Sequence, residues 1–164
     1  MSLATAYPTK PAGSLPDSAL GDVGTRLRRL RETALPSGAL SGPRHARALD
    51  SLYAACRSAS SENWDGYGAR PVGASAFEHA KVFLQLLPTD ASFPDVSVDP
   101  DGEIALEWYL APRAVFSVSI GEEGLISYAG LFGWNKVNGV EVFAGAIPVA
   151  VLQSLRRLLS SARS

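Results

Sequence analysis

Acidic side chains are the residues in this sequence whose spacing comes nearest to a chemical site. Asp99 and Asp101 lie in an Asp-Pro-Asp-Gly stretch, and Glu103 and Glu107 follow it on the next predicted strand. Carboxylates this close together can bind a divalent metal ion or act as a general acid and base. A solvated strand face beside a turn has the same pattern. A metal-dependent enzyme that uses this acidic face is therefore an alternative, and not the main hypothesis.

Other residues with chemical potential do not strengthen an enzymatic interpretation. His45 and His79 fall on different predicted helices, and the single cysteine, Cys56, falls on the apolar face of a helix. The sequence has no Gly-x-Ser-x-Gly motif, no phosphate-binding loop and no dinucleotide fingerprint. We therefore assign no catalytic residue, no metal ligand and no cofactor, and we favour a protein that is not an enzyme.

A loop rich in glycine and aromatic residues, at positions 60–71, fits neither helix nor strand throughout. Trp64 and Tyr67 can anchor it on a core while Asp65 caps a turn, and this interpretation receives more weight. Alternatively, the loop forms the lip of a binding surface. The residues predicted to bind a partner are Trp64, Asp65, Tyr67, Arg70, Tyr109 and Trp134.

An arginine cluster is the pattern that favours nucleic acid. It alternates with apolar residues at helical spacing between residues 24 and 34 and can contact phosphates. A solvated helix face, or a contact with the acidic sheet of the same or another chain, explains it equally, and a pI of about 6.1 is not typical of a DNA-binding domain. The cluster and its apolar neighbours are Arg26, Arg28, Arg29 and Arg31 beside Val23, Leu27, Leu30 and Ala34.

The elements that must position these residues centre on 94–143. Apolar and polar residues alternate there with the period of two that is typical of half-buried strands. Short turns favour antiparallel neighbours. The predicted strands are 95–99, 103–110, 114–120, 125–132 and, after a loop at 133–139, a short strand at 140–143. One strand should direct Ile104, Leu106, Trp108 and Leu110 to the core.

Helices are predicted before and after this sheet. Their apolar stripes predict helices at 43–59, at 75–87 after a Ser75–Glu78 capping box, and at 149–162. We therefore expect an α+β fold: an antiparallel four- to five-stranded β-meander with helices before and after it, packed on one face. The predicted organisation is a disordered or loosely held arm (1–24), a basic helical segment (25–60) and the α+β domain (61–164).

The second face of the predicted sheet is the best hint of an interaction. An apolar strip there needs either the N-terminal helices or another chain to cover it. A protein partner or self-association is therefore expected. The strip consists of Ala105, Tyr109, Val115, Leu125, Ala129 and Leu131.

Composition and charge set the cellular context. The 164 residues are 46% hydrophobic and 19% charged, as in a soluble globular protein. No apolar run approaches the ~20 residues of a membrane helix, and the N-terminus lacks a signal-peptide pattern. A cytoplasmic location without membrane contact is expected. Residues 1–60 hold eight Lys and Arg against four Asp and Glu, whereas residues 61–145 hold four against twelve. These oppositely charged parts can attract one another.

One combination of motifs resembles a known pattern. The loop Asn-Trp-Asp-Gly-Tyr-Gly-Ala (63–69) is followed by Pro71, by a helix ending in Leu-Leu-Pro88, and by Asp-Pro-Asp-Gly (99–102) and Leu-Glu-Trp (106–108). It is similar to an uncharacterised family of small bacterial proteins, often encoded on mobile or phage-derived DNA. The resemblance covers residues 62–145 and implies an accessory role in a mobile-element, toxin–antitoxin or defence system. The resulting hypothesis is a non-enzymatic protein-binding module.

Overall fold

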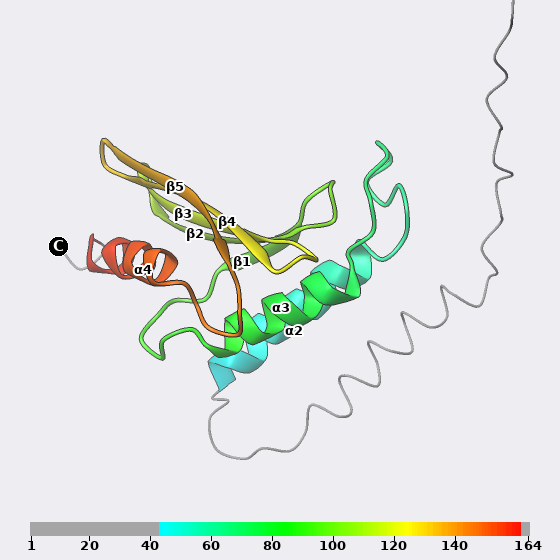
Figure 1. Cartoon of the computed structure of the whole chain (residues 1–164), viewed down its shortest axis with the longest axis horizontal. Coiled ribbons are helices and arrows are strands. Elements are labelled where there is room, and N and C mark those ends of the chain that lie inside the picture. The colour runs from blue at the N-terminus through cyan, green and yellow to red at the C-terminus, as the bar shows by residue number, and fades with distance from the viewer. Residues whose placement is uncertain (1–42, 162–164) are drawn as a thin grey trace, which may run out of the picture.

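The computed structural model of the protein describes residues 43–161 (Figure 1). The predicted arm, the helix predicted at 24–34 and the four clustered arginines lie outside these residues. In chain order the elements are α2 (Pro43–Ser58), α3 (Ala74–Gln85), β1 (Asp95–Val98), β2 (Ile104–Ala111), β3 (Ala114–Ile120), β4 (Leu125–Phe132), β5 (Asn135–Val142) and α4 (Val149–Ser161).

The sheet is a five-stranded meander whose strand order follows the chain, with each neighbouring pair antiparallel. Its register aligns Leu106, Val118 and Tyr128 across adjacent strands. Because side chains alternate between faces, this register directs the large apolar residues of β2, β3 and β4 to one side, called here the inner face. Trp108 and Phe116 are buried there in an aromatic contact with ring centroids 6.0 Å apart.

The helices of the described part cover the inner face (Figure 1). α2 packs against β1 and α3, α3 against β2 and β3, and α4 against β3 and β4. The predicted α+β meander with helices before and after it on one face is thus confirmed. Burial of an aliphatic or aromatic side chain stabilises a fold by about 1.5–3 kcal/mol. The largest fully buried side chains include Leu52, Phe77, Phe83, Ile120, Ile126 and Leu155.

The last strand differs from its prediction. The segment predicted as a loop at 133–139 belongs to β5, because Phe132 pairs with Asn135 and leaves a two-residue turn, Gly133-Trp134. Gly133 has φ +63°, as a type II′ hairpin turn requires at its first central position. Asparagine, lysine and glycine are poor strand formers, so β5 forms by pairing with β4 rather than by its own propensity.

Two local predictions were wrong. α3 begins at Ala74 with Gly73 as its N-cap, so Ser75 lies inside the first turn and does not form a capping box. The Val72 N–H donates to the carbonyl of Ala59 (3.0 Å), and this bond sets where the chain enters α3. Leu110 is 36% exposed rather than buried, because the β2–β3 register shifts between residues 109 and 111.

Candidate functional site

The loop of residues 63–70, called here the aromatic loop, is closed by its own hydrogen bonds. The Asn63 side-chain oxygen accepts a bond from the Gly68 N–H (2.7 Å). Asp65 Oδ1 accepts bonds from the backbone N–H groups of Tyr67 (2.7 Å) and Ala69 (3.1 Å), so Asp65 caps this turn as expected. The Asn63 N–H in turn donates to the Ala69 carbonyl (2.8 Å). Side-chain and backbone bonds together give the loop a defined shape.

Trp64 and Tyr67 have different roles in this loop. Trp64 is partly buried against the hydrophobic core, and its indole Nε1–H donates to the Arg70 carbonyl (3.0 Å). Tyr67 is 95% exposed at the tip. Gly66 and Gly68 have φ of +80° and +92°, which an L side chain rarely adopts and which allow the loop to reverse. Trp64 therefore anchors the loop, while Tyr67 projects from it.

The aromatic loop is attached to the turn between β1 and β2. The Arg70 N–H donates to the Pro100 carbonyl (2.8 Å). On the same turn, Gly102 has φ +87°, and a Cβ there would lie 2.8 Å from the Pro71 carbonyl oxygen. Glycine is required at this position because both the backbone conformation and the close approach exclude a side chain. These contacts hold the loop at one end of the sheet.

Two acidic residues at this turn, Asp101 and Glu103, accept structural hydrogen bonds. Asp101 Oδ1 accepts a bond from the Glu103 N–H (3.1 Å), and the Ser119 hydroxyl donates to the Glu103 carboxylate. Burial raises the pKa of Asp99, and the charges of Asp101 and Glu103 raise it further. Glu107 lies farther along β2, opposite Asp95 on β1. Within residues 43–161, no three His, Cys, Asp or Glu side chains are grouped so that they could hold a metal ion.

The face of the sheet opposite the helices, called here the outer face, carries exposed apolar side chains. No helix of residues 43–161 covers it (Figure 1). Tyr109, Val140 and Val142 are 57%, 62% and 68% exposed. Of the apolar strip predicted from the sequence, Ala105, Val115 and Leu131 are half-buried, and Tyr109, Leu125 and Ala129 are exposed.

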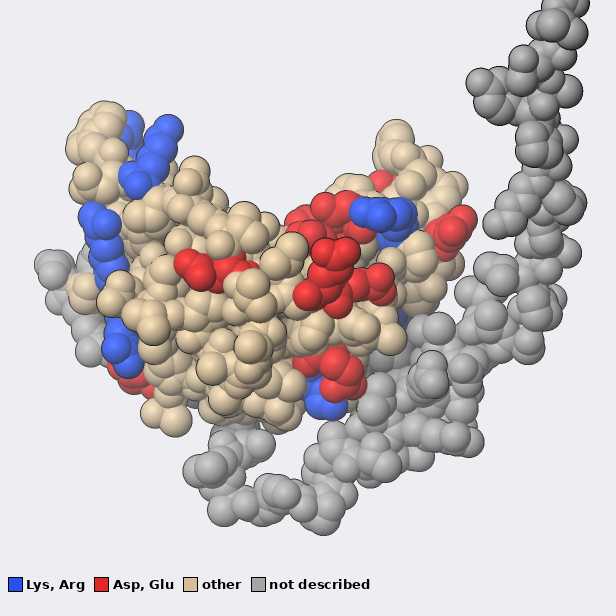
Figure 2. Space-filling view, viewed as in Figure 1, with Lys and Arg blue, Asp and Glu red and all other residues tan. Residues whose placement is uncertain are grey.

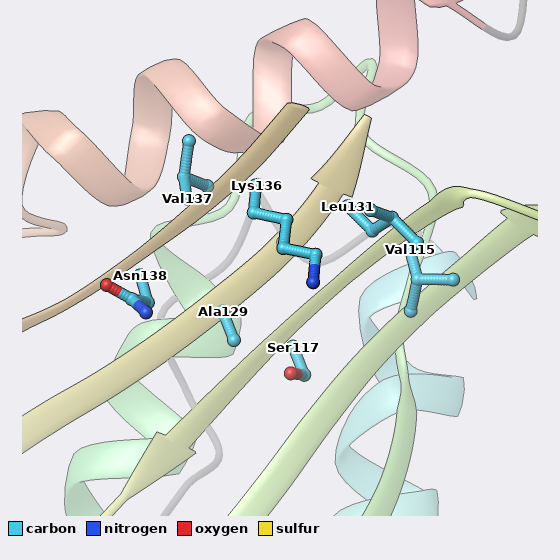
Figure 3. Close-up of a pocket in the computed structure, with 8 residues that line it drawn as sticks. Val115, Ser117, Ala129, Leu131, Lys136, Val137 and Asn138 are labelled. Carbon is cyan, nitrogen blue, oxygen red and sulfur yellow. The ribbon is translucent and has the colours of Figure 1, made fainter. Parts of the chain in front are cut away.

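A shallow depression of about 290 Å³ lies across β3, β4 and β5 on the outer face (Figure 3). The small side chains of Ser117 and Ala129 form one row of its lining, and the larger Val115 and Leu131 form the next row along the same strands. Lys136 on β5 extends beside them. The Lys136 ammonium beside the depression can donate hydrogen bonds to a carboxylate or carbonyl oxygen.

Two projections flank the outer face, which is hollowed between them (Figure 2). One is the aromatic loop with Tyr67. The other is the β4–β5 hairpin, whose tip residue Trp134 is 84% exposed and is stacked against the Arg113 guanidinium, 3.4 Å from the ring centroid. Acidic side chains gather between the hollow and the loop, and basic ones on the hairpin side (Figure 2).

The predicted binding residues form two groups rather than one site. Trp64, Asp65, Tyr67 and Arg70 lie in the aromatic loop, whereas Tyr109 and Trp134 lie at the end of the sheet that carries the β4–β5 hairpin. The outer face of the sheet lies between the two groups. Sequence reasoning missed Lys136 and Asn138 because residues 133–139 were predicted as a loop, and it assigned no role to Val140 and Val142, which belong to the short strand predicted at 140–143. The Gly-Trp turn followed by alternating valines is the signal that would have found them.

Comparison with family models, with curated proteins and with solved structures finds no match to this chain. The resemblance of residues 62–145 to small bacterial accessory proteins therefore stays a prediction. Among the described helices, none has both the length and the apolar character needed to cross a membrane.

Proposed function

We propose that this protein is a non-enzymatic protein-binding module whose contact surface is the outer face of the sheet. One observation carries the proposal. The helices of residues 43–161 all pack on the inner face, while Tyr109, Val140 and Val142 remain more than half exposed on the outer face. An uncovered sheet face that carries several exposed apolar side chains is characteristic of an interaction site.

The two projections support this assignment because their shape is set before a partner binds. The aromatic loop is closed by the Asn63 and Asp65 side chains, and Trp134 is held by Arg113. Exposed aromatic residues on such elements are favoured in protein interfaces, since they bury a large area with few rotatable bonds. Their order also reduces the entropy cost of association. Tyr67 and Trp134 are therefore assigned to the two ends of the contact surface.

The experiment is an affinity capture from the native host with the full chain, followed by mass spectrometry. Val140→Ser with Val142→Ser removes apolar surface from the outer face, and Val149→Ser is the matched control. Val149 is 69% exposed, like Val142 at 68%, but it lies at the start of α4. We expect one stoichiometric protein that the double variant loses and the control retains.

Binding of the captured protein is then measured by titration calorimetry. We expect the double variant to bind at least about tenfold more weakly, which is about 1.4 kcal/mol. Tyr67→Ala and Trp134→Ala should each weaken binding as well. Capture of nothing, or equal capture by all variants, contradicts the assignment of the outer face.

The biological setting of the module is part of the proposal. We assign the module to the accessory proteins of a mobile-element, toxin–antitoxin or defence system. This assignment is supported only by the resemblance of the aromatic loop and its flanking motifs. In that setting a captured partner is expected to be encoded close to this protein in the genome. A partner encoded at an unrelated locus contradicts the proposed setting but does not contradict the assignment of the binding surface.

A further inference from the structure

We infer that the edge strand β5 pairs with β5 of a second copy of this chain, so that the two sheets become one. The inference goes beyond the proposed function, because it rests on the backbone groups along the edge of the sheet and not on a partner of the outer face. The two strands run antiparallel about a twofold axis that passes through Gly139 perpendicular to the sheet.

The first argument is the direction in which the backbone groups of β5 point. The Phe143 N–H donates to the Gly124 carbonyl (2.7 Å), on the side of β4. In an antiparallel ladder every second residue points the same way, so the even-numbered residues of β5 direct their N–H and C=O groups away from β4. β5 is last in the strand order, and no strand of residues 43–161 receives these groups. The outward-facing residues are Lys136, Asn138, Val140 and Val142.

The second argument is the contrast between the two edges of the sheet. The other edge strand, β1, has four residues and lies between Pro94 and Pro100. Short length and proline are means by which proteins prevent pairing at an edge. β5 has eight residues, contains no proline and follows β4 without a shift in register. Its length and regularity therefore suit it to accept another strand.

The third argument is the register. A twofold axis perpendicular to the sheet keeps the outer faces of both copies on the same side, so each outward-facing residue pairs with another outward-facing residue. With the axis at Gly139, Asn138 lies opposite Val140 of the second copy, and Lys136 lies opposite Val142. All four outward-facing residues then exchange hydrogen bonds within the paired strands. A shift of the axis by one residue in either direction leaves one of the four without a partner in β5.

Gly139 suits the position on the axis. In this register the two Gly139 residues form a pair without mutual hydrogen bonds, in which opposing Cα atoms lie about 4.5 Å apart. On the inner face, a Cβ at this position would lie 2.5 Å from the Tyr128 hydroxyl oxygen. Glycine therefore allows the close approach of the two strands and leaves the space beside the axis to Tyr128.

The side chains of the outer face are compatible with this pairing. Val140 and Val142, which are 62% and 68% exposed, pack against Asn138 and the aliphatic stem of Lys136 of the second copy. The two Lys136 residues lie about 20 Å apart, six positions along the strands, so their repulsion is largely screened. Because Lys136 and Asn138 also line the depression, the valines of the second copy extend its wall on the β5 side.

The test is sedimentation velocity of the full chain from micromolar to submillimolar concentration, where we expect a reversible dimer. Val140→Pro removes one outward-facing N–H without removing a bond to β4, since proline is tolerated at such a position of an edge strand. We expect it to weaken dimerisation at least about tenfold. Val140→Ala, which retains the N–H, is the matched control and should still dimerise. Circular dichroism confirms that each variant is folded.

A second pair of variants leaves the backbone unchanged. Asn138→Asp with Val140→Asp places carboxylates directly opposite one another across the axis, and Asn138→Lys with Val140→Lys places ammonium groups there. Like charges in opposing positions repel, so each variant alone should be a monomer. An equimolar mixture should recover the dimer, because every carboxylate then faces an ammonium group of the other chain.

The outcomes separate this inference from the proposed function. A monomer at every concentration, a dimer that Val140→Pro leaves unchanged, or charge variants that do not recover on mixing overturns the inference. A monomer whose capture of a partner is lost in Val140→Pro and retained in Val140→Ala assigns the edge to a strand of that partner, and it also overturns pairing with a second copy. A dimer of the expected kind with no captured partner overturns the proposed function alone.

Discussion

Replacement of Trp64 by alanine tests whether the aromatic loop is anchored by its tryptophan. Removal of a fully buried tryptophan costs about 3–5 kcal/mol of the free energy of unfolding. Trp64 is only partly buried, so about 2 kcal/mol is expected from packing. Loss of the indole bond to the Arg70 carbonyl adds up to about 1 kcal/mol. The expected total is about 2–3 kcal/mol.

The assay is thermal unfolding followed by circular dichroism, with urea unfolding as a second measurement. For a chain of this size, 1 kcal/mol corresponds to about 3–5 °C in Tm, so Trp64→Ala should lower Tm by about 6–15 °C. Trp64→Phe keeps most of the packing but loses the indole donor. Its Tm should therefore lie between that of the unchanged protein and that of Trp64→Ala.

Tyr67→Ala is the control within the same loop. Because Tyr67 is 95% exposed, its removal should change Tm by no more than about 1 °C. A decrease of less than about 2 °C for Trp64→Ala would refute the reasoning. The tryptophan would then belong to a binding lip, and its replacement should reduce partner capture instead of stability.

Three further predictions concern the turns and the core. Gly102→Ala should destabilise the fold by about 2–3 kcal/mol in urea unfolding, since it combines a positive φ with a close approach to Pro71, whereas Gly145→Ala, at φ +79° in open space, should cost about 1 kcal/mol. Because the folded-state pKa of Asp99 is raised, stability falls as pH rises through that pKa; Asp99→Asn should therefore raise the urea midpoint at pH 7, and the gain should vanish near pH 3, below the unfolded pKa. Cys56 should resist a thiol reagent at pH 8 in the folded protein and react once urea unfolds it, and rapid native-state labelling would contradict its burial.

The candidate site was accessible to sequence reasoning only in part. A loop that combines aromatic residues with glycines, together with aromatic residues on strands, indicated a binding surface. The residue type alone did not determine the role of each aromatic side chain. Trp64 and Tyr67 are three positions apart in one loop, yet one packs on the core and the other projects into solvent. That difference depends on the Asp65 and Asn63 bonds that turn the loop.

The fold was predicted best where a local pattern has one physical solution. The alternation of β3 and β4 defined both strands to the residue, because one face must be buried and a shift by one position would reverse every side chain. The apolar stripes of α3 and α4 predicted their buried faces for the same reason.

By itself, the sequence determined the class of the fold, the inner face of the sheet and the separation of a basic N-terminal part from an acidic sheet. Burial and periodicity are local properties, so a single chain displays them. Only the tertiary structure decided that Asn135–Val142 forms a full edge strand, that the aromatic loop is attached to the β1–β2 turn, and that the helices of residues 43–161 leave the outer face open. These features arise from contacts between residues distant in sequence, whose energies no local pattern records.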